Sequence, residues 1–281
     1  MPCELVTETY GVQLPARYEL RRLDPDIEPW LRALSAYVLL LDLPIYTPLY
    51  KDRQPIKRLL EDNRKRKAAQ LHCVESGLSY GIFDKEYRYK RPESAATGGA
   101  VYWHEIDPDD PDLEETGQQK LLEAIDFPIV CAALSYDKAI PIPPEVMEGV
   151  VGFIPEYNYP RTFLAASLSS VGYKPETPKR GEVLVRGGTM TRRDYVGRGL
   201  MTAISRFIMH DAHVRGFKKI DMPMANASVS KIWLNPPAPY RAELVVDIDI
   251  RENEVEIDGK MVRLFSEAKS GLFQFAILHL R

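Results

Sequence analysis

A glycine-containing turn that leads directly into an amphipathic helix constrains this chain more than any other feature. Residues 194–203 read Asp-Tyr-Val-Gly-Arg-Gly-Leu-Met-Thr-Ala. Gly197 and Gly199 allow the backbone to approach a ligand closely because glycine has no Cβ. Apolar residues then recur at helical spacing, which predicts a helix from Leu200. A helix N-terminus presents free N–H groups and the positive end of its dipole, so the turn is suited to a phosphate.

Strand-like sequence lies on both sides of this turn and helix. Residues 182–185 and 189–191 resemble one strand interrupted by Gly187 and Gly188, and paired glycines inside a strand predict a bulge. Gly216 is expected to end the helix in a left-handed conformation. The predicted order is therefore strand with bulge, phosphate-binding turn, helix and strand.

The better-known phosphate loops do not match this turn. The chain has no Gly-x-x-x-x-Gly-Lys-Ser/Thr run, and residue 202 is Thr where the Gly-x-Gly-x-x-Gly fingerprint has its third glycine. The turn instead resembles the coenzyme A-binding signature of the GNAT superfamily of N-acetyltransferases, with Asp194-Tyr195 as the pair that precedes it. The chain also has a general likeness to fungal members of that superfamily. Val196 and Met201 depart from the residues usual there, but backbone amides do most of the phosphate binding.

The resemblance implies an α/β (α+β) fold of the GNAT-like acyl-CoA N-acyltransferase type. Its mixed central sheet would be splayed between the fourth and fifth strands, with flanking helices. The implied co-substrate is acetyl-CoA, with no metal. The cofactor-binding residues that it implies are Met190, Thr191, Val196, Gly197, Arg198, Gly199, Leu200, Met201, Thr202 and Asn226.

A second motif supports the same resemblance. Residues 226–233 read Asn-Ala-Ser-Val-Ser-Lys-Ile-Trp and are similar to the family's Asn-Pro-x-Ala-x-x-Leu-Tyr helix. In the family, the Asn contacts the cofactor and the Tyr often protonates the departing thiolate. Trp233 occupies the Tyr position and cannot serve as an acid. Tyr240 is the nearest replacement in the sequence, and catalysis without an acid is the alternative because a thiol pKa near ~8.5 makes a thiolate an acceptable leaving group.

The rest of the chain is predicted to complete one domain over residues 1–281. Asp24 is expected to cap a helix that runs through Val38. An acidic and proline-rich segment at about 105–147 is interpreted as an insertion between two strands. The other expected strands are 18–23, 79–83, 100–104 and 150–154.

The resemblance also suggests how an amine would be acylated. Backbone amides near Met190 and Thr191 would polarise the thioester carbonyl, and Glu182 or His104 would take the amine proton. Aromatic residues are expected to line the pocket for a small-molecule amine acceptor, which would then have an apolar or aromatic body. The candidate acceptor-binding residues are Tyr46, Tyr50, Trp103 and Tyr157.

Several other patterns favour less specific interpretations. Residues 77–81 match the Gly-x-Ser-x-Gly motif of hydrolases, but helix-like sequence precedes the serine and strand-like sequence follows it, the reverse of what that motif requires. His210 and His213 have a spacing that suits a metal, without a third ligand evident in the sequence. The basic run 64–67 is expected to end a helix that begins near Gln54. The acidic run 105–115 is expected to be a solvated loop or to attract a cationic amine.

Composition limits the remaining classes. The 281 residues carry a formal net charge of −3, which gives no basic footprint for nucleic acid. The apolar run 36–41 is far too short to span a bilayer, and three widely spaced cysteines with no signal-peptide pattern predict a cytoplasmic protein. A non-catalytic protein that binds coenzyme A, or that mediates an interaction, is the alternative to the enzyme.

Overall fold

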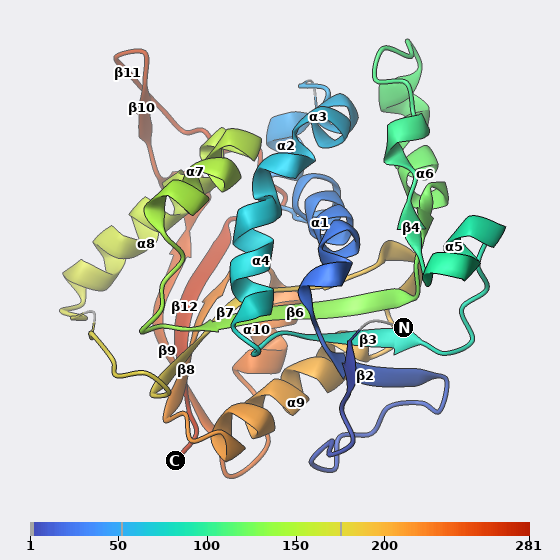
Figure 1. The fold of residues 1–281 in the computed structure, drawn as a ribbon. Helices are drawn as coiled ribbons and strands as arrows, with labels where there is room; N and C mark the ends of the chain where they lie inside the picture. Colours follow the sequence, from blue (N-terminus) through green and yellow to red (C-terminus); the bar gives the residue numbers. More distant parts are fainter. Residues whose placement is uncertain (1–2, 52, 175) are drawn as a thin grey trace.

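One mixed sheet of eight strands forms the centre of the described part of the chain (Figure 1). The structure is a computed structural model that describes residues 3–51, 53–174 and 176–281. The strand order is β1-β2-β3-β6-β7-β8-β12-β9, and all neighbours pair antiparallel except β7 and β8. These strands are β1 (Glu4–Leu5), β2 (Tyr18–Arg22), β3 (Tyr80–Asp84), β6 (Ile129–Asp137), β7 (Val183–Thr191), β8 (Lys219–Met224), β9 (Arg241–Asp249) and β12 (Leu272–His279). Two short ribbons lie outside the sheet: β4 (Ala100–Val101) with β5 (Ile125–Asp126), and β10 (Val255–Ile257) with β11 (Lys260–Val262).

Helices cover both faces of the sheet and divide the core into two parts. Figure 1 shows α9 on one face, and α1, α4, α7 and α8 on the other. The buried apolar residues form two clusters accordingly, one that includes α9 and α10 and one that includes α1, α7 and α8. The α-helices are α1 (Glu28–Tyr37), α2 (Thr47–Tyr50), α3 (Pro55–Asp62), α4 (Lys67–Glu75), α5 (Pro92–Thr97), α6 (Leu113–Glu123), α7 (Pro144–Phe153), α8 (Asn158–Ser170), α9 (Leu200–Val214) and α10 (Ala227–Trp233).

The sheet opens between its two parallel strands. Val183–Val185 of β7 pair with Lys219–Asp221 of β8, whereas β7 continues to Thr191. The register between β6 and β7 shifts so that Gly187 is left out of the pairing. A bulge bends its strand, and here it lies where β7 diverges from β8. The predicted bulge and the predicted splayed sheet are both confirmed.

The turn and the helix after it form as the sequence predicts. Gly197 and Gly199 have φ of 83° and 76°, which is the left-handed region that favours glycine. Helix α9 begins at Leu200, and Gly216 follows its end with φ of 91°. Asp24 accepts a hydrogen bond from the amide of Asp26, which is the predicted cap at the start of the first helix.

Three predicted elements need correction. The segment 105–147 contains β6, a central strand, because its continuous apolar sequence is buried under helices on both faces of the sheet. Residues 150–154 belong largely to helix α7, which begins at Pro144 and packs closely at Gly149, where a Cβ would lie 2.2 Å from the carbonyl oxygen of Lys65. The strand expected at 100–104 ends at Val101, and Trp103 begins a 3-10 turn.

The helix predicted from Gln54 through the basic run is interrupted. Helix α3 ends at Asp62, and residues 63–66 form a 3-10 turn that leads into α4. Arg66 therefore lies at a junction between two helices, and it is buried whereas Arg64, Lys65 and Lys67 are exposed.

Candidate functional site

A cavity of about 540 Å³ occupies the opening between β7 and β8. Its volume is within the range typical of small-molecule sites. Residues 185–190 of β7 line one side, and Pro223, Ala225, Asn226 and Val229 line the other. Side chains from α1, α4, α7 and α8, which lie on the face of the sheet opposite α9, complete the wall of the cavity. The cavity therefore lies where the sheet opens and where the two layers of helices meet.

The glycine turn follows directly from the strand that lines this cavity. A Cβ added at Gly197 or Gly199 would meet no atom within 4 Å, so the surface of the turn is open. Of the described residues, none accepts a hydrogen bond from the N–H groups of residues 197–202. Free N–H groups at the start of a 15-residue helix form an anion site of the kind that binds phosphate.

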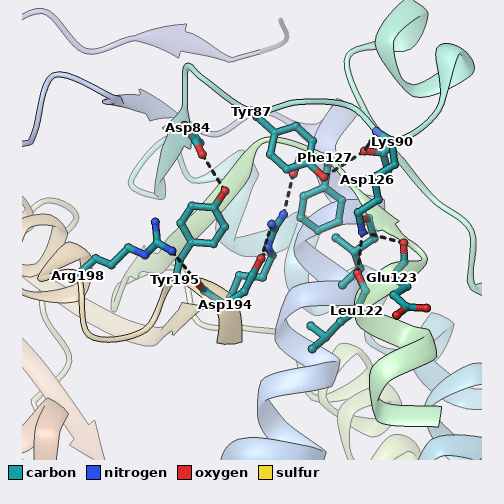
Figure 2. A network of polar contacts seen from close by, with 12 residues as sticks. Asp84, Tyr87, Lys90, Leu122, Glu123, Asp126, Phe127, Asp194, Tyr195 and Arg198 are labelled. Carbon is teal, nitrogen blue, oxygen red and sulfur yellow. Dashed lines mark hydrogen bonds and ion pairs between the residues drawn. The ribbon is translucent and has the colours of Figure 1, made fainter. Parts of the chain in front are cut away.

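A network of polar contacts anchors the turn to the sheet (Figure 2). The Tyr195 hydroxyl donates to Asp84 Oδ2 at 2.7 Å, and Arg17 donates two hydrogen bonds to the same carboxylate. The guanidinium groups of Arg192 and Arg198 lie 4.7 and 4.5 Å from the centroid of the Tyr195 ring. Arg17 makes a third such contact, with its guanidinium carbon 6.0 Å from the same centroid. Tyr195 is thus held by a buried hydrogen bond and three cation–π contacts, and this fixes the position of the turn.

Arginine side chains before and after Tyr195 make further hydrogen bonds that hold the backbone of the turn. Arg192 donates from Nε and Nη2 to Asp194, at 2.7 Å each, and from Nη1 to the carbonyl of Phe127. Arg198 Nη2 donates to the carbonyl of Asp194 at 3.0 Å. The backbone before and after Tyr195 is therefore tied to the sheet independently of any ligand.

We predict that Tyr195→Phe destabilises the fold by roughly 1–3 kcal/mol at neutral pH, because a buried carboxylate loses a donor. Burial alone would raise the pKa of Asp84, yet the hydrogen bonds from Arg17 and Tyr195 lower it overall. A lowered pKa contributes stability above the ordinary aspartate value, and that stability is lost as the pH falls through the folded-state pKa. Urea unfolding at pH 7 and pH 3 measures this: the difference between wild type and variant should be smaller at pH 3. An equal difference at both pH values would contradict the assignment to Asp84.

A second feature of the site is a buried cation beside the bulge. Arg186 is 6% exposed, and its Nε has no hydrogen-bond partner among the described residues. Its guanidinium carbon lies 5.8 Å from the centroid of the Trp233 ring. Burial lowers the pKa of Arg186 to about 10, so it stays charged at neutral pH. An unpaired buried charge is costly to fold, and an anionic ligand would offset that cost.

Two more arginines line the cavity from the opposite face of the sheet. Arg66 comes from the junction before α4, and Arg161 comes from α8. Arg66 Nη1 donates to Ser35 Oγ at 3.1 Å, whereas Arg66 Nε and the neighbouring Gln70 Oε1 have no partner in the described ranges. No Asp or Glu is among the described residues that line the cavity. The cavity is therefore positively charged.

The structure brings some of the sequence-predicted residues together at this cavity. Met190, Asn226, Tyr46 and Tyr157 line it. Tyr46 and Tyr157 stack with ring centroids 6.5 Å apart. Asn226 caps α10 through its Oδ1, which accepts from the amides of Ser228 and Val229. Its Nδ2 donates no hydrogen bond within the described ranges, so it remains available to a ligand.

The structure places other predicted residues elsewhere. Tyr50 is buried and donates to Glu156, and the indole of Trp103 donates to the carbonyl of Leu121 at 3.0 Å. Both are packing residues and do not line the cavity.

The predicted catalytic residues also lie away from the cavity. Glu182 precedes β7, and a hydrogen bond from Lys218 lowers the pKa of its carboxyl. His104 is exposed on a 3-10 turn. The Tyr240 hydroxyl lies 2.8 Å from Nδ1 of His210, and burial raises the pKa of that phenol. The three side chains are not assembled around one point, and none of them lines the cavity.

The sequence analysis missed the three arginines, although the sequence carried a signal for two of them. Asn63, Arg66 and Gln70 recur at helical spacing and are all buried, so a polar stripe faces inward where apolar residues are expected. Arg186 interrupts the apolar run of β7 immediately before the bulge. Arg161 has no such signal, because α8 is largely polar and exposed around it.

Other patterns in the sequence have ordinary structural roles. Ser79 lies between helix α4 and strand β3, the reverse of a hydrolase elbow, and its hydroxyl donates to the carbonyl of Cys73. His213 Nδ1 lies 2.6 Å from the carbonyl oxygen of Leu280. Within the described ranges, no three His, Cys, Asp or Glu side chains are grouped as a metal site requires. Among the same residues, no helix has both the length and the apolar character needed to cross a bilayer.

Comparison with solved structures identifies the fold. Over 94% of this chain and 88% of the other, the chain is similar to a putative arylalkylamine N-acetyltransferase 7 from the yellow fever mosquito, with a TM-score of 0.53 and 12% sequence identity. The chain therefore has the fold of N-acetyltransferases, with a mixed sheet and helices on both faces. The likeness to fungal members stays a prediction.

Two further structures are similar at lower scores. The C-terminal condensation domain of Ebony, in complex with beta-alanyl-dopamine, gives a TM-score of 0.49 at 15% identity and covers 93% of this chain and 97% of that domain. A mosquito arylalkylamine N-acetyltransferase-like protein 5b gives 0.39 at 13% identity over 75% of this chain and 78% of its own. No protein-family model matches the sequence, and no curated protein matches it.

Proposed function

We propose that this protein is an acyl-CoA-dependent N-acyltransferase that moves an acetyl group from acetyl-CoA to a small-molecule amine. The observation that carries the proposal is the continuity of one strand. Residues 185–190 of β7 line the cavity, and the same strand leads into the open glycine turn at the start of α9. A phosphate carrier with a long reactive arm fits this arrangement, because its phosphates and its reactive end need separate sites.

The cofactor contacts follow from this placement. The pyrophosphate would accept hydrogen bonds from the N–H groups of residues 197–202, with Arg198 adding positive charge. The pantetheine arm would pair with the free edge of β7 beyond Val185, as an added strand does. The thioester would then lie beside the bulge at Gly187, at the entrance to the cavity.

The reaction would be a direct transfer between two bound reactants. The lone pair of a neutral amine attacks the carbonyl carbon of the thioester, a C–N bond forms, and the C–S bond breaks with its electron pair leaving on sulfur. Backbone amides of β7 beside the bulge, where the thioester would lie, would stabilise the oxyanion; this is earlier in the strand than Met190 and Thr191, the residues expected from the sequence. No Asp, Glu or His is among the described lining residues, so the amine proton would leave through water.

Arg186 would stabilise the departing thiolate. Its guanidinium lies over Trp233, which occupies the position of the acidic tyrosine in the resembled family. A fixed cation in a buried site offsets negative charge that develops during the reaction. The chain would thus replace proton donation to sulfur by electrostatic stabilisation.

Binding of acetyl-CoA tests the proposal directly. At 100 times the dissociation constant, a ligand stabilises the folded state by about 2.7 kcal/mol, which raises the Tm of a chain of this size by roughly 5 °C. We expect this shift with acetyl-CoA and a smaller one with ADP-ribose, which lacks the pantetheine arm. No shift at millimolar acetyl-CoA would overturn the proposal.

A non-catalytic coenzyme A-binding protein is the second candidate. The observation that favours it is the lack of Asp, Glu and His among the described residues that line the cavity. Release of free coenzyme A in the presence of an amine panel separates the two candidates. A binder would give the thermal shift and release no thiol with any amine.

A further inference from the structure

We infer that the cavity takes a reactant that carries a carboxylate, and that this reactant is the amine acceptor: an amino acid-like molecule with an apolar or aromatic body. That the acceptor is an amine rests on the proposed function. That the reactant carries a carboxylate is inferred separately, from the charged residues that line the cavity.

Arg66 provides the first half of a built anion site. It is 9% exposed, and burial lowers the pKa of its guanidinium to about 10, so the group remains charged. The described residues give it one hydrogen bond, to the neutral hydroxyl of Ser35, and no carboxylate partner. Its Nε is buried with no acceptor among the described residues, and the side chain as a whole lines the cavity. A buried guanidinium with a free donor needs an anion to offset its desolvation.

Arg161 provides the second half from another element. Arg161 is an exposed residue of α8. Its guanidinium carbon stacks 3.9 Å from the centroid of the Tyr157 ring, so the cation is held beside the cavity while its N–H edge is open to water or to a ligand. Among the described residues it has no salt bridge. Arg66 and Arg161 reach the same cavity from the junction before α4 and from α8, and two cations on separate elements suit a bidentate carboxylate.

The nearby acidic groups do not neutralise these arginines. Glu156 is adjacent in sequence to Tyr157, but its carboxylate accepts from Tyr50 and pairs with Arg53. In the acidic run, Asp109 pairs with Lys57 and Asp110 pairs with Lys120, away from the cavity. No residue of the acidic run lines the cavity among the described residues, so the run does not neutralise these arginines.

The other residues that line the cavity indicate which side chain the acceptor carries. The cavity surface between the arginines is apolar and aromatic, and it includes Leu39, Leu43, Ile142, Met147 and Tyr46. Such walls suit an aromatic or branched aliphatic side chain. Because the arginines come from helices on the face opposite α9, they lie on the acceptor side of β7 and away from the phosphate turn.

The experiment compares matched acceptors and matched variants. Phenylalanine and phenethylamine differ only by the carboxylate, and release of coenzyme A from acetyl-CoA is measured for each. Release of coenzyme A is also measured with succinyl-CoA and phenethylamine, because activity with this pair would place the carboxylate on the acyl group. The variants are Arg161→Gln and Arg66→Gln, with Arg64→Gln as control because Arg64 is an exposed arginine of the same run that does not line the cavity. Calorimetric binding of N-acetylphenylalanine, N-acetyltyrosine, N-acetyltryptophan and N-acetylleucine gives a readout that needs no turnover.

We expect phenylalanine to be the better acceptor, with KM raised roughly ten- to one-hundred-fold in Arg161→Gln and Arg66→Gln and unchanged in Arg64→Gln. A requirement for succinyl-CoA in place of the amino acid would overturn the assignment of the carboxylate to the acceptor and place it on the acyl group. Equal use of phenethylamine, with Arg161→Gln unchanged, would overturn the inference and leave the acyltransferase intact. Arginine-dependent binding of an N-acetyl amino acid without binding of acetyl-CoA would support the carboxylate site and overturn the proposed function. Failure of all four N-acetyl amino acids to bind would overturn the inference.

Discussion

Gly199→Asp is expected to weaken acetyl-CoA binding at least about tenfold. The substitution places a carboxylate on the turn where the pyrophosphate would lie, and two charges about 4 Å apart repel by roughly 1–4 kcal/mol between bulk water and a protein surface. Space does not limit the change, because a Cβ at this glycine meets no atom within 4 Å. Calorimetric titration with acetyl-CoA measures the loss.

Gly199→Asn is the matched control for this change. Asn and Asp have nearly the same shape and both tolerate the left-handed conformation that Gly199 adopts. The asparagine variant should therefore bear the same backbone cost without the repulsion. If both variants bind acetyl-CoA with the same affinity, the turn does not hold the pyrophosphate.

Arg186→Met is expected to lower kcat roughly 100-fold while leaving the fold as stable as before or more so. The loss in kcat follows if the guanidinium stabilises the thiolate, since removal of one preorganised group of this kind costs about that much. Stability is expected to be kept or increased because the substitution removes an unpaired charge from a buried position. A well-packed apolar side chain in place of a buried charge is often neutral or stabilising. Steady-state kinetics and urea unfolding measure the two effects separately.

Arg186→Lys is the control that keeps the charge. We expect it to retain more activity than Arg186→Met, but less than wild type, because an ammonium cannot reproduce the planar fork of the guanidinium. If kcat and stability fall together in Arg186→Met, the residue holds the strand in place and has no role at the sulfur.

The local signals in the sequence predicted the turn, bulge and helix of the proposed cofactor site. Glycines at 197, 199 and 216 marked a turn and a helix end, and both features depend on left-handed backbone conformations that few other residues adopt. The glycine pair at 187 and 188 marked the bulge. Apolar spacing placed α9, and the Asn at 226 placed the start of α10. These are short-range effects, so the sequence alone specified them.

The acceptor half depended on contacts that local patterns do not encode. Strand β6 is apolar on both faces because helices cover both, and such a run cannot be distinguished from a buried helix by its spacing. The same ambiguity led residues 150–154 to be predicted as a strand. The aromatic candidates were selected by composition, and only packing separated Tyr46 and Tyr157, on the cavity, from Tyr50 and Trp103, which have partners in the core.

The sequence by itself determined the phosphate turn, the bulged strand and the helix between them, because those features follow from glycine positions and from periodicity within about 35 residues. Only the tertiary structure decided the charge of the cavity. Arg66, Arg161 and Arg186 are separated by 95 and 25 residues in the chain, and they share one cavity because the sheet opens at β7 and helices from two distant segments cover the opening. Arg66 and Arg186 are buried whereas Arg161 is exposed, and whether an arginine is a surface charge or a buried cation depends on what packs around it, which is a property of the fold.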